Sequence, residues 1–162
     1  MQRLKTALKA WPVITVVAML LSFITKELAH GLFGITLESQ ASVKLVKSMA
    51  GCNMPFLTMT ASIVILMPII EEFVFRFLLW KLPSRNQRLL WAIPSSILFV
   101  AAHYIQMPWP DNSFIALFFF AMALCWLYKT TSRLWCPVLV HILFNATNLM
   151  LVLALPEKYL AS

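Results

Sequence analysis

The sequence contains little charge. Charged residues make up 12% of its 162 residues, whereas about a quarter of the residues in an ordinary soluble domain are charged. Hydrophobic residues make up 61%, and the mean hydropathy is +0.83. Too few polar side chains remain to cover a surface that faces water. The composition therefore excludes a soluble globular domain and predicts an integral membrane protein in contact with the lipid bilayer.

Glycine and cysteine are also scarce. The three glycines, at positions 31, 34 and 51, form no phosphate-cradling loop and no dinucleotide fingerprint, which argues against chemistry that depends on NTP or NAD. The three cysteines form no CxxC pair, so neither a disulfide framework nor a thiolate zinc site is indicated. These cysteines are Cys52, Cys125 and Cys136.

The basic residues, 13 Lys and Arg against 6 Asp and Glu, lie in short clusters between apolar runs. This distribution is typical of cytoplasmic loops of membrane proteins and argues against a nucleic-acid partner. With the N-terminus in the cytoplasm, one side of the membrane receives Arg3, Lys5, Lys9, Lys81, Arg85, Arg88, Lys129 and Arg133. The other side receives Lys26, Lys44, Lys47 and Lys158. The imbalance predicts a cytoplasmic N-terminus and a C-terminus on the opposite side.

Apolar runs predict an all-α fold, a polytopic transmembrane helix bundle with about five spans. The expected spans cover about residues 10–25, 55–80, 89–107, 112–128 and 134–156. No repeat or linker is evident, so residues 1–162 are expected to form a single membrane domain.

The segments on either side of the first predicted span allow further interpretations. Its basic start followed by a short apolar run also fits a signal peptide, but no small-x-small cleavage site follows Thr25, which favours a retained span. The polar stretch 26–54 is expected to be a loop with a short interfacial helix around 39–50.

The second predicted span carries three ionisable residues within six positions. An ionised side chain at the centre of a membrane helix costs about 2.5–3.5 kcal/mol, so such residues need partners or a function. Glu72 and Arg76 are four residues apart and can pair on one helix face. Glu71 is turned about 100° away from Glu72 and remains available for chemistry. A buried ion pair that only locks helix packing is the alternative interpretation.

Two histidines lie in other apolar spans. His103 is in the third span, and His141, Asn145 and Asn148 form a polar stripe on one face of the fifth span. Counting about 1.5 Å per residue from the span ends puts Glu71, His103, His141 and Asn145 in one layer about 10 Å thick. Pro68 and Pro137, each within four residues of a candidate group, can open a helical turn near this layer.

This set of side chains suits hydrolysis of a peptide bond. Glu71, shielded from bulk water, could take a proton from a water molecule with the help of His103. His141 and Asn145 could then donate hydrogen bonds to the oxyanion. No Ser or Cys nucleophile competes, because no obvious base accompanies any of them on its own turn. The residues considered are Ser95, Ser96, Cys125 and Cys136.

A metal-dependent version would use the same side chains differently. Glu71, His103 and His141 would form a His₂Glu set for Zn²⁺ with one open position for water. The sequence does not separate the two versions, although it lacks the HExxH motif of many zinc proteases.

Three motifs in order carry a family resemblance: Glu71-Glu72-x-x-x-Arg76, Phe99-x-x-x-His103 and His141-x-x-x-Asn145. They resemble the signature motifs of the CPBP family, the CAAX proteases and bacteriocin-processing enzymes also called the Abi family. The resemblance covers about residues 55–150.

The resemblance implies an intramembrane endopeptidase in a bacterial plasma membrane, acting on a membrane-embedded or membrane-associated peptide. Carried over, Glu71 and His103 activate water, and His141 and Asn145 bind the oxyanion. Glu72, Arg76 and Phe99 become supporting residues.

Two other functions use the same features. A membrane scaffold or bacteriocin-immunity protein of the same fold would bind a peptide or a partner without cutting it. A proton or cation carrier built on Glu71 and Glu72 is the second alternative. The chain lacks the repeats and paired broken helices of transporters, which argues against it.

Overall fold

The computed structural model describes residues 2–35, 53–82, 87, 90–105 and 113–154. Helices account for nearly all of these residues, and no strand occurs among them. The helices are α1 (Gln2–Phe33), α3 (Asn53–Ala61), α4 (Met67–Glu72), α5 (Ala92–His103), α6 (Phe114–Thr131) and α7 (Trp135–Ala154). A π-helical segment, Ser62–Leu66, joins α3 to α4. A second π-helical segment, Phe73–Leu78, follows α4 and leads into a 3₁₀ turn, Leu79–Lys81.

The predicted helical membrane bundle is confirmed. Within the described ranges, α1, α6 and α7 are each long and apolar enough to cross a bilayer, and α5 is a shorter apolar helix. Large apolar side chains are exposed along their outer faces, as at Val13 (62% exposed) and Phe23 (61%). Such a surface is stable only against lipid, so the protein is an integral membrane protein.

The first helix is longer than the predicted span 10–25. α1 begins at Gln2 and continues to Phe33, so the expectation that residues 26–33 belong to a loop is wrong. Lys26 and Glu27 do not interrupt the helix, because charged side chains are tolerated where a helix leaves the lipid. The helix ends where Gly34 adopts φ +64°, and the amides of Gly34 and Ile35 bond to the carbonyls of His30 and Ala29. The interfacial helix expected around 39–50 lies outside the described residues.

The third helix is shorter than predicted. α5 covers Ala92–His103 rather than about 89–107. Its twelve residues rise about 18 Å, less than the roughly 30 Å of a bilayer core. Pro94 fits the first turn, where its missing N–H costs no helical hydrogen bond, and Tyr104 leaves the helical conformation.

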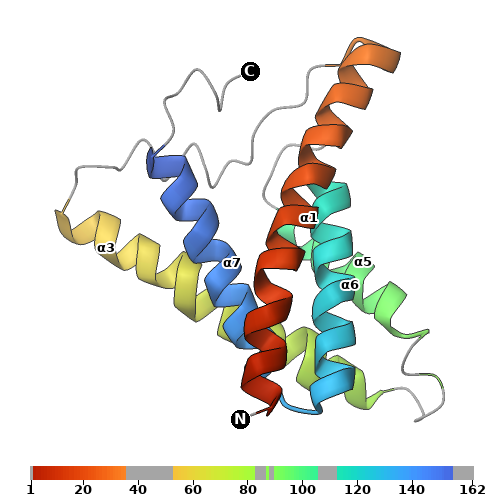
Figure 1. Cartoon of the computed structure of the whole chain (residues 1–162), viewed down its shortest axis with the longest axis vertical. Coiled ribbons are helices and arrows are strands. Elements are labelled where there is room, and N and C mark those ends of the chain that lie inside the picture. Colours follow the sequence, from red (N-terminus) through yellow and green to blue (C-terminus); the bar gives the residue numbers. More distant parts are fainter. Residues whose placement is uncertain (1, 36–52, 83–86, 88–89, 106–112, 155–162) are drawn as a thin grey trace.

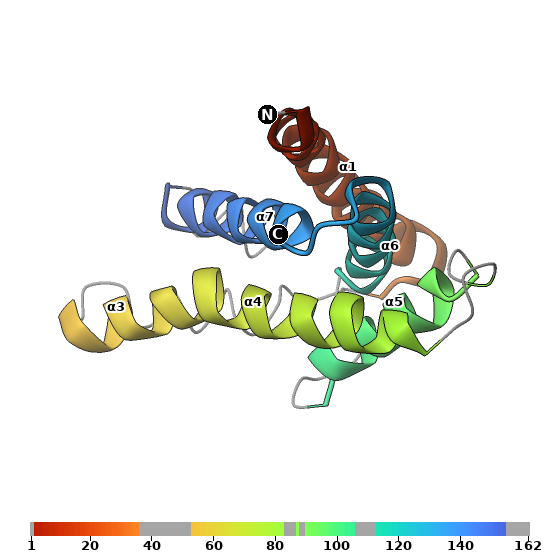
Figure 2. The ribbon, with the colours of Figure 1, turned by 90° about the horizontal axis from the view of Figure 1, so that it is seen from below.

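The second predicted span is one continuous helical rod from Asn53 to Lys81, here called the glutamate helix (Figure 2). Figure 2 shows it along one side of the bundle, with α1, α6 and α7 on the other side. Its two π-helical segments flank α4, which carries Glu71 and Glu72. Pro68 lies in α4 just after the first π-helical segment, in keeping with the predicted opening of a turn. Pro137, by contrast, lies in the first turn of α7 and opens no turn inside the helix.

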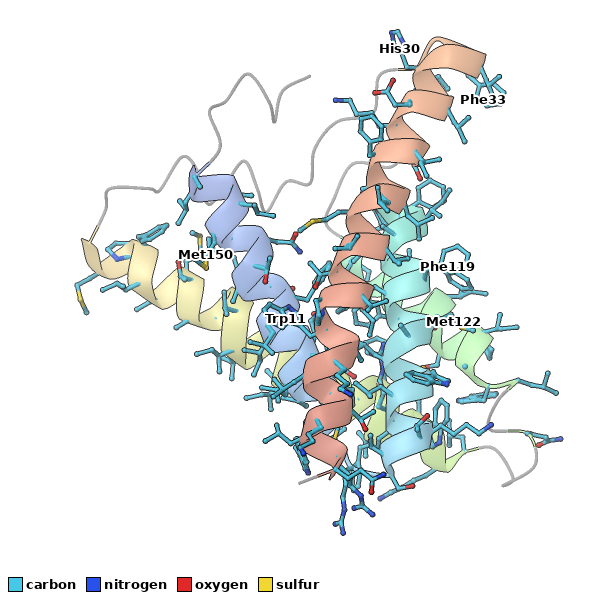
Figure 3. The ribbon with its side chains drawn as sticks, in the orientation of Figure 1. Trp11, His30, Phe33, Phe119, Met122 and Met150 are labelled. Atoms are coloured by element: carbon cyan, nitrogen blue, oxygen red, sulfur yellow. The ribbon has the colours of Figure 1, made fainter. Side chains whose placement is uncertain are left out.

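The core lies where α1, α6 and α7 meet α5 and the glutamate helix. α1 and α6 run side by side (Figure 1), and α1 also packs on α7. The buried cluster there consists of Ala7, Phe75, Phe99, Leu117, Phe120, Ala121, Leu124, Leu127, Cys136 and Val140. His30 and Phe33 mark the end of α1 that projects beyond this packed region (Figure 3). The polar side chains of Glu72 and Arg76 border this core on the inner face of the glutamate helix.

Candidate functional site

Glu72, Arg76 and His141 form a buried polar cluster. Glu72 and Arg76 are 0% exposed, and the carboxylate oxygen Oε1 lies 3.0 Å from the guanidinium Nη1. The same oxygen lies 3.0 Å from Nδ1 of His141, which α7 brings against the glutamate helix. Arg76 Nη2 also donates to the carbonyl of Ala121 at 3.1 Å, which fixes the guanidinium against α6. The predicted pair of Glu72 and Arg76 is confirmed, and it extends through His141 to a third helix.

Glu71 stands apart from this pair, as predicted from its position on the helix. Its side chain is 16% exposed, and its two oxygens face two different histidines. Oε1 lies 3.9 Å from Nε2 of His103, and Oε2 lies 3.6 Å from Nε2 of His141. These separations exceed a direct hydrogen bond. The structure therefore brings together the carboxylate and the two imidazoles that the sequence had placed on three separate spans.

The other ring nitrogens fix the orientation of both imidazoles. Nδ1 of His103 lies 2.9 Å from the carbonyl of Phe99, which can only accept a hydrogen bond. Nδ1 of His141 lies 3.0 Å from Oε1 of Glu72, the carboxylate oxygen that also contacts the guanidinium of Arg76. These contacts hold both rings in orientations in which their Nε2 atoms face Glu71.

The ring of Phe99 contacts the guanidinium of Arg76 and the imidazoles of His103 and His141. Its ring is fully buried, and the Arg76 guanidinium carbon lies 4.7 Å from the ring centroid. The rings of His103 and His141 lie 4.6 and 5.9 Å from the same centroid. An aromatic face attracts a cation and excludes water from one side of it. Phe99 thus belongs to the apolar core and contacts the polar cluster from that side.

Asn145 ties α7 to a weak point of the glutamate helix. Its amide nitrogen Nδ2 donates to the carbonyl of Ile63 at 3.0 Å. In the first π-helical segment the Met67 amide bonds to the carbonyl of Ser62, and the next residue, Pro68, has no N–H. The carbonyl of Ile63 therefore depends on a side-chain donor. One amide hydrogen of Asn145 fills that role, which leaves the second available for other bonds.

The predicted zinc set does not fit this arrangement. Two ligands at about 2.0–2.1 Å from a tetrahedral ion lie about 3.3 Å apart, closer than Glu71 lies to either histidine. Among the residues that the structure describes, no group of three His, Cys, Asp or Glu side chains is placed to hold a metal ion.

Comparison with protein families matches residues 53–147 to the family described as Type II CAAX prenyl endopeptidase, Rce1-like. The chain belongs to this family. No curated protein and no solved structure matches the chain. Members of this family are CAAX-type intramembrane proteases, which act on membrane-associated peptides. The resemblance carried by the three sequence motifs is confirmed.

Within this Rce1-like domain, the sequence missed two contacts of the candidate residues. The bond between His141 and Glu72 links α7 to the glutamate helix across 69 positions of the chain, and no local pattern specifies which turns of two helices meet. The bond from Asn145 to Ile63 could have been sought, because Pro68 leaves a carbonyl without its usual donor. The structure places Asn148 on the same helix as Asn145, where it is half-buried.

Proposed function

We propose that this Rce1-like protein is an intramembrane endopeptidase that uses Glu71 as a general base without a metal ion. The observation that supports the proposal most directly is the position of Glu71 between the Nε2 atoms of His103 and His141. The carboxylate is partly shielded from water, and Glu72 and Arg76 on the same helix pair with each other. A base in this setting can take a proton from water.

The proposed reaction requires a hydrogen on both ring nitrogens of His141. Nδ1 lies 3.0 Å from Oε1 of Glu72, and Nε2 lies 3.6 Å from Oε2 of Glu71. Each nitrogen donates a hydrogen bond when it carries a hydrogen.

The reaction then follows from the positions of these groups. Glu71 accepts a proton from a water molecule that His103 helps to orient, and the water oxygen bonds to the carbonyl carbon of the peptide. The carbonyl electrons move to its oxygen, which becomes an oxyanion. Nε2–H of His141 and the second amide hydrogen of Asn145 stabilise that charge. The proton held by Glu71 passes to the leaving nitrogen as the C–N bond breaks.

We also propose how the chain lies in its membrane. We place residues 1–162 in one membrane domain of a bacterial plasma membrane with the N-terminus in the cytoplasm. The substrate is a membrane-associated peptide, because the candidate site lies on helices that are surrounded by lipid-facing apolar side chains.

The activity can be tested with the full-length protein in proteoliposomes. We expect cleavage of an internally quenched CAAX peptide, supplied with and without a farnesyl group on its cysteine, with products identified by mass spectrometry. Activity should persist in the presence of EDTA or 1,10-phenanthroline.

Each outcome of this assay is decisive for one part of the proposal. Loss of activity with the chelators and recovery on adding Zn²⁺ would contradict the metal-free mechanism. Binding of both peptides without cleavage of either would contradict the protease and favour the scaffold function. The ratio of the two rates reports whether the lipid group matters.

Asn145→Ala is expected to lower kcat by about 10²–10³, with a smaller change in KM, because the lost donor acts on the oxyanion. The variant also loses the bond to Ile63, so its free energy of unfolding should fall by about 1 kcal/mol, the net contribution of one hydrogen bond. Asn148→Ala, one turn further along α7, is the matched control. An unchanged kcat in a folded Asn145→Ala protein would remove this residue from the mechanism.

A further inference from the structure

A cavity lies at the end of the bundle where α1 begins, α6 ends and α7 begins. Its volume is about 680 Å³, and its lining includes Gln2, Arg3, Thr6, Thr130, Thr131 and Trp135. Figure 1 shows the N-terminus and the connection between α6 and α7 at this same end. The catalytic candidates are on other turns, and none of them lines this cavity.

The charged side chains on the segments around this cavity are all positive. Besides Arg3, the exposed side chains of Lys5, Lys129 and Arg133 belong to the segments that form the cavity. Residues 2–11 and 126–139 contain no Asp or Glu. The cavity therefore suits a negatively charged ligand.

The same place also has the polarity gradient of a bilayer boundary. Three helix ends meet there, and Trp135, 44% exposed, is a residue type typical of the membrane–water interface. Leu4 lines the cavity, and Leu8 continues the same face of α1 one turn deeper. Both leucines are nearly half exposed, at 44% and 45%. A ligand with a charged head and apolar tails would match this order of side chains.

We propose that this cavity binds the headgroup of an anionic phospholipid, with Arg3 beside the phosphate and the acyl chains along Leu4 and Leu8. The cations attract the negative headgroup, and each is worth about fivefold in affinity near an anionic membrane surface. The lipid joins the start of α1 to the link between α6 and α7, and it stabilises the packing of these three helices.

The test uses the full-length protein purified in detergent and titrated with phosphatidylglycerol or phosphatidylcholine. Native mass spectrometry should show retained phosphatidylglycerol, and thermal unfolding should show a rise in Tm of about 3–6 °C at a tenfold excess over Kd. Arg3→Gln should weaken phosphatidylglycerol binding about fivefold. Arg3 is exposed at the first turn, so this variant should fold normally.

Lys26→Gln is the matched control, because it removes one positive charge from the other end of α1. It should bind phosphatidylglycerol as the unchanged protein does. Equal stabilisation by phosphatidylcholine, an equal rise in Tm with inorganic phosphate alone, or unweakened binding in Arg3→Gln would overturn the proposal.

Discussion

Replacing Glu71 by glutamine is expected to lower kcat by about 10²–10⁴, the range that a positioned general base contributes. Glutamine has nearly the same size as glutamate, so it can occupy the same space between His103 and His141. Its amide cannot accept a proton at neutral pH, and water then lacks its base. Cleavage of the quenched peptide in proteoliposomes measures the effect.

Two other variants make this result specific. Glu27→Gln removes an exposed carboxylate from α1 and should leave kcat and KM unchanged. Glu71→Asp keeps the base but withdraws it by one methylene from both histidines, and we expect it to retain part of the activity. A Glu71→Gln protein that cleaves the peptide at the original rate would exclude Glu71 as the base.

Replacing Arg76 by alanine is expected to destabilise the fold by about 3–5 kcal/mol, because it leaves the carboxylate of Glu72 buried without its guanidinium. For a chain of this length, such a loss corresponds to a fall in Tm of about 6–20 °C. The substitution also removes the donor to the Ala121 carbonyl and the cation on the face of Phe99. Thermal unfolding in detergent measures the change.

A double substitution separates charge from packing in this prediction. Arg76→Met keeps most of the side-chain volume, and adding Glu72→Gln removes the unpaired charge while retaining an acceptor for His141. The double variant should therefore be more stable than Arg76→Met alone. If the two are equally unstable, the pair contributes through shape, and the electrostatic explanation fails.

Local patterns predicted the features that depend on neighbouring residues. The pair of Glu72 and Arg76 follows from a spacing of four on one helix, and the inward direction of His103 and His141 follows from the cost of polar groups in lipid. The convergence of these residues on Glu71 also requires that three helices hold them at one depth, which the rise of about 1.5 Å per residue indicated. The family motifs pointed to the same residues.

Features that depend on helix ends and on register between helices were predicted poorly. Counting charges ended the first span at Thr25, although Gly34 carries the real stop signal for α1. The length of α5 depends on where Tyr104 leaves the helix, and hydropathy says nothing about that residue. The bond between Glu72 and His141 depends on how α7 is set against the glutamate helix, which only the packed structure specifies.

The aromatic side chain of Phe99 has a spectroscopic consequence. Its circulating π electrons alter the magnetic field at nearby nuclei, and the rings of His103 and His141 both lie within 6 Å of its centroid. The NMR signals of these imidazoles should therefore be displaced from those of His30, which is exposed near the far end of α1. A fluorine label on Phe99 would sense a peptide arriving at either histidine, and would thus report occupancy without any turnover.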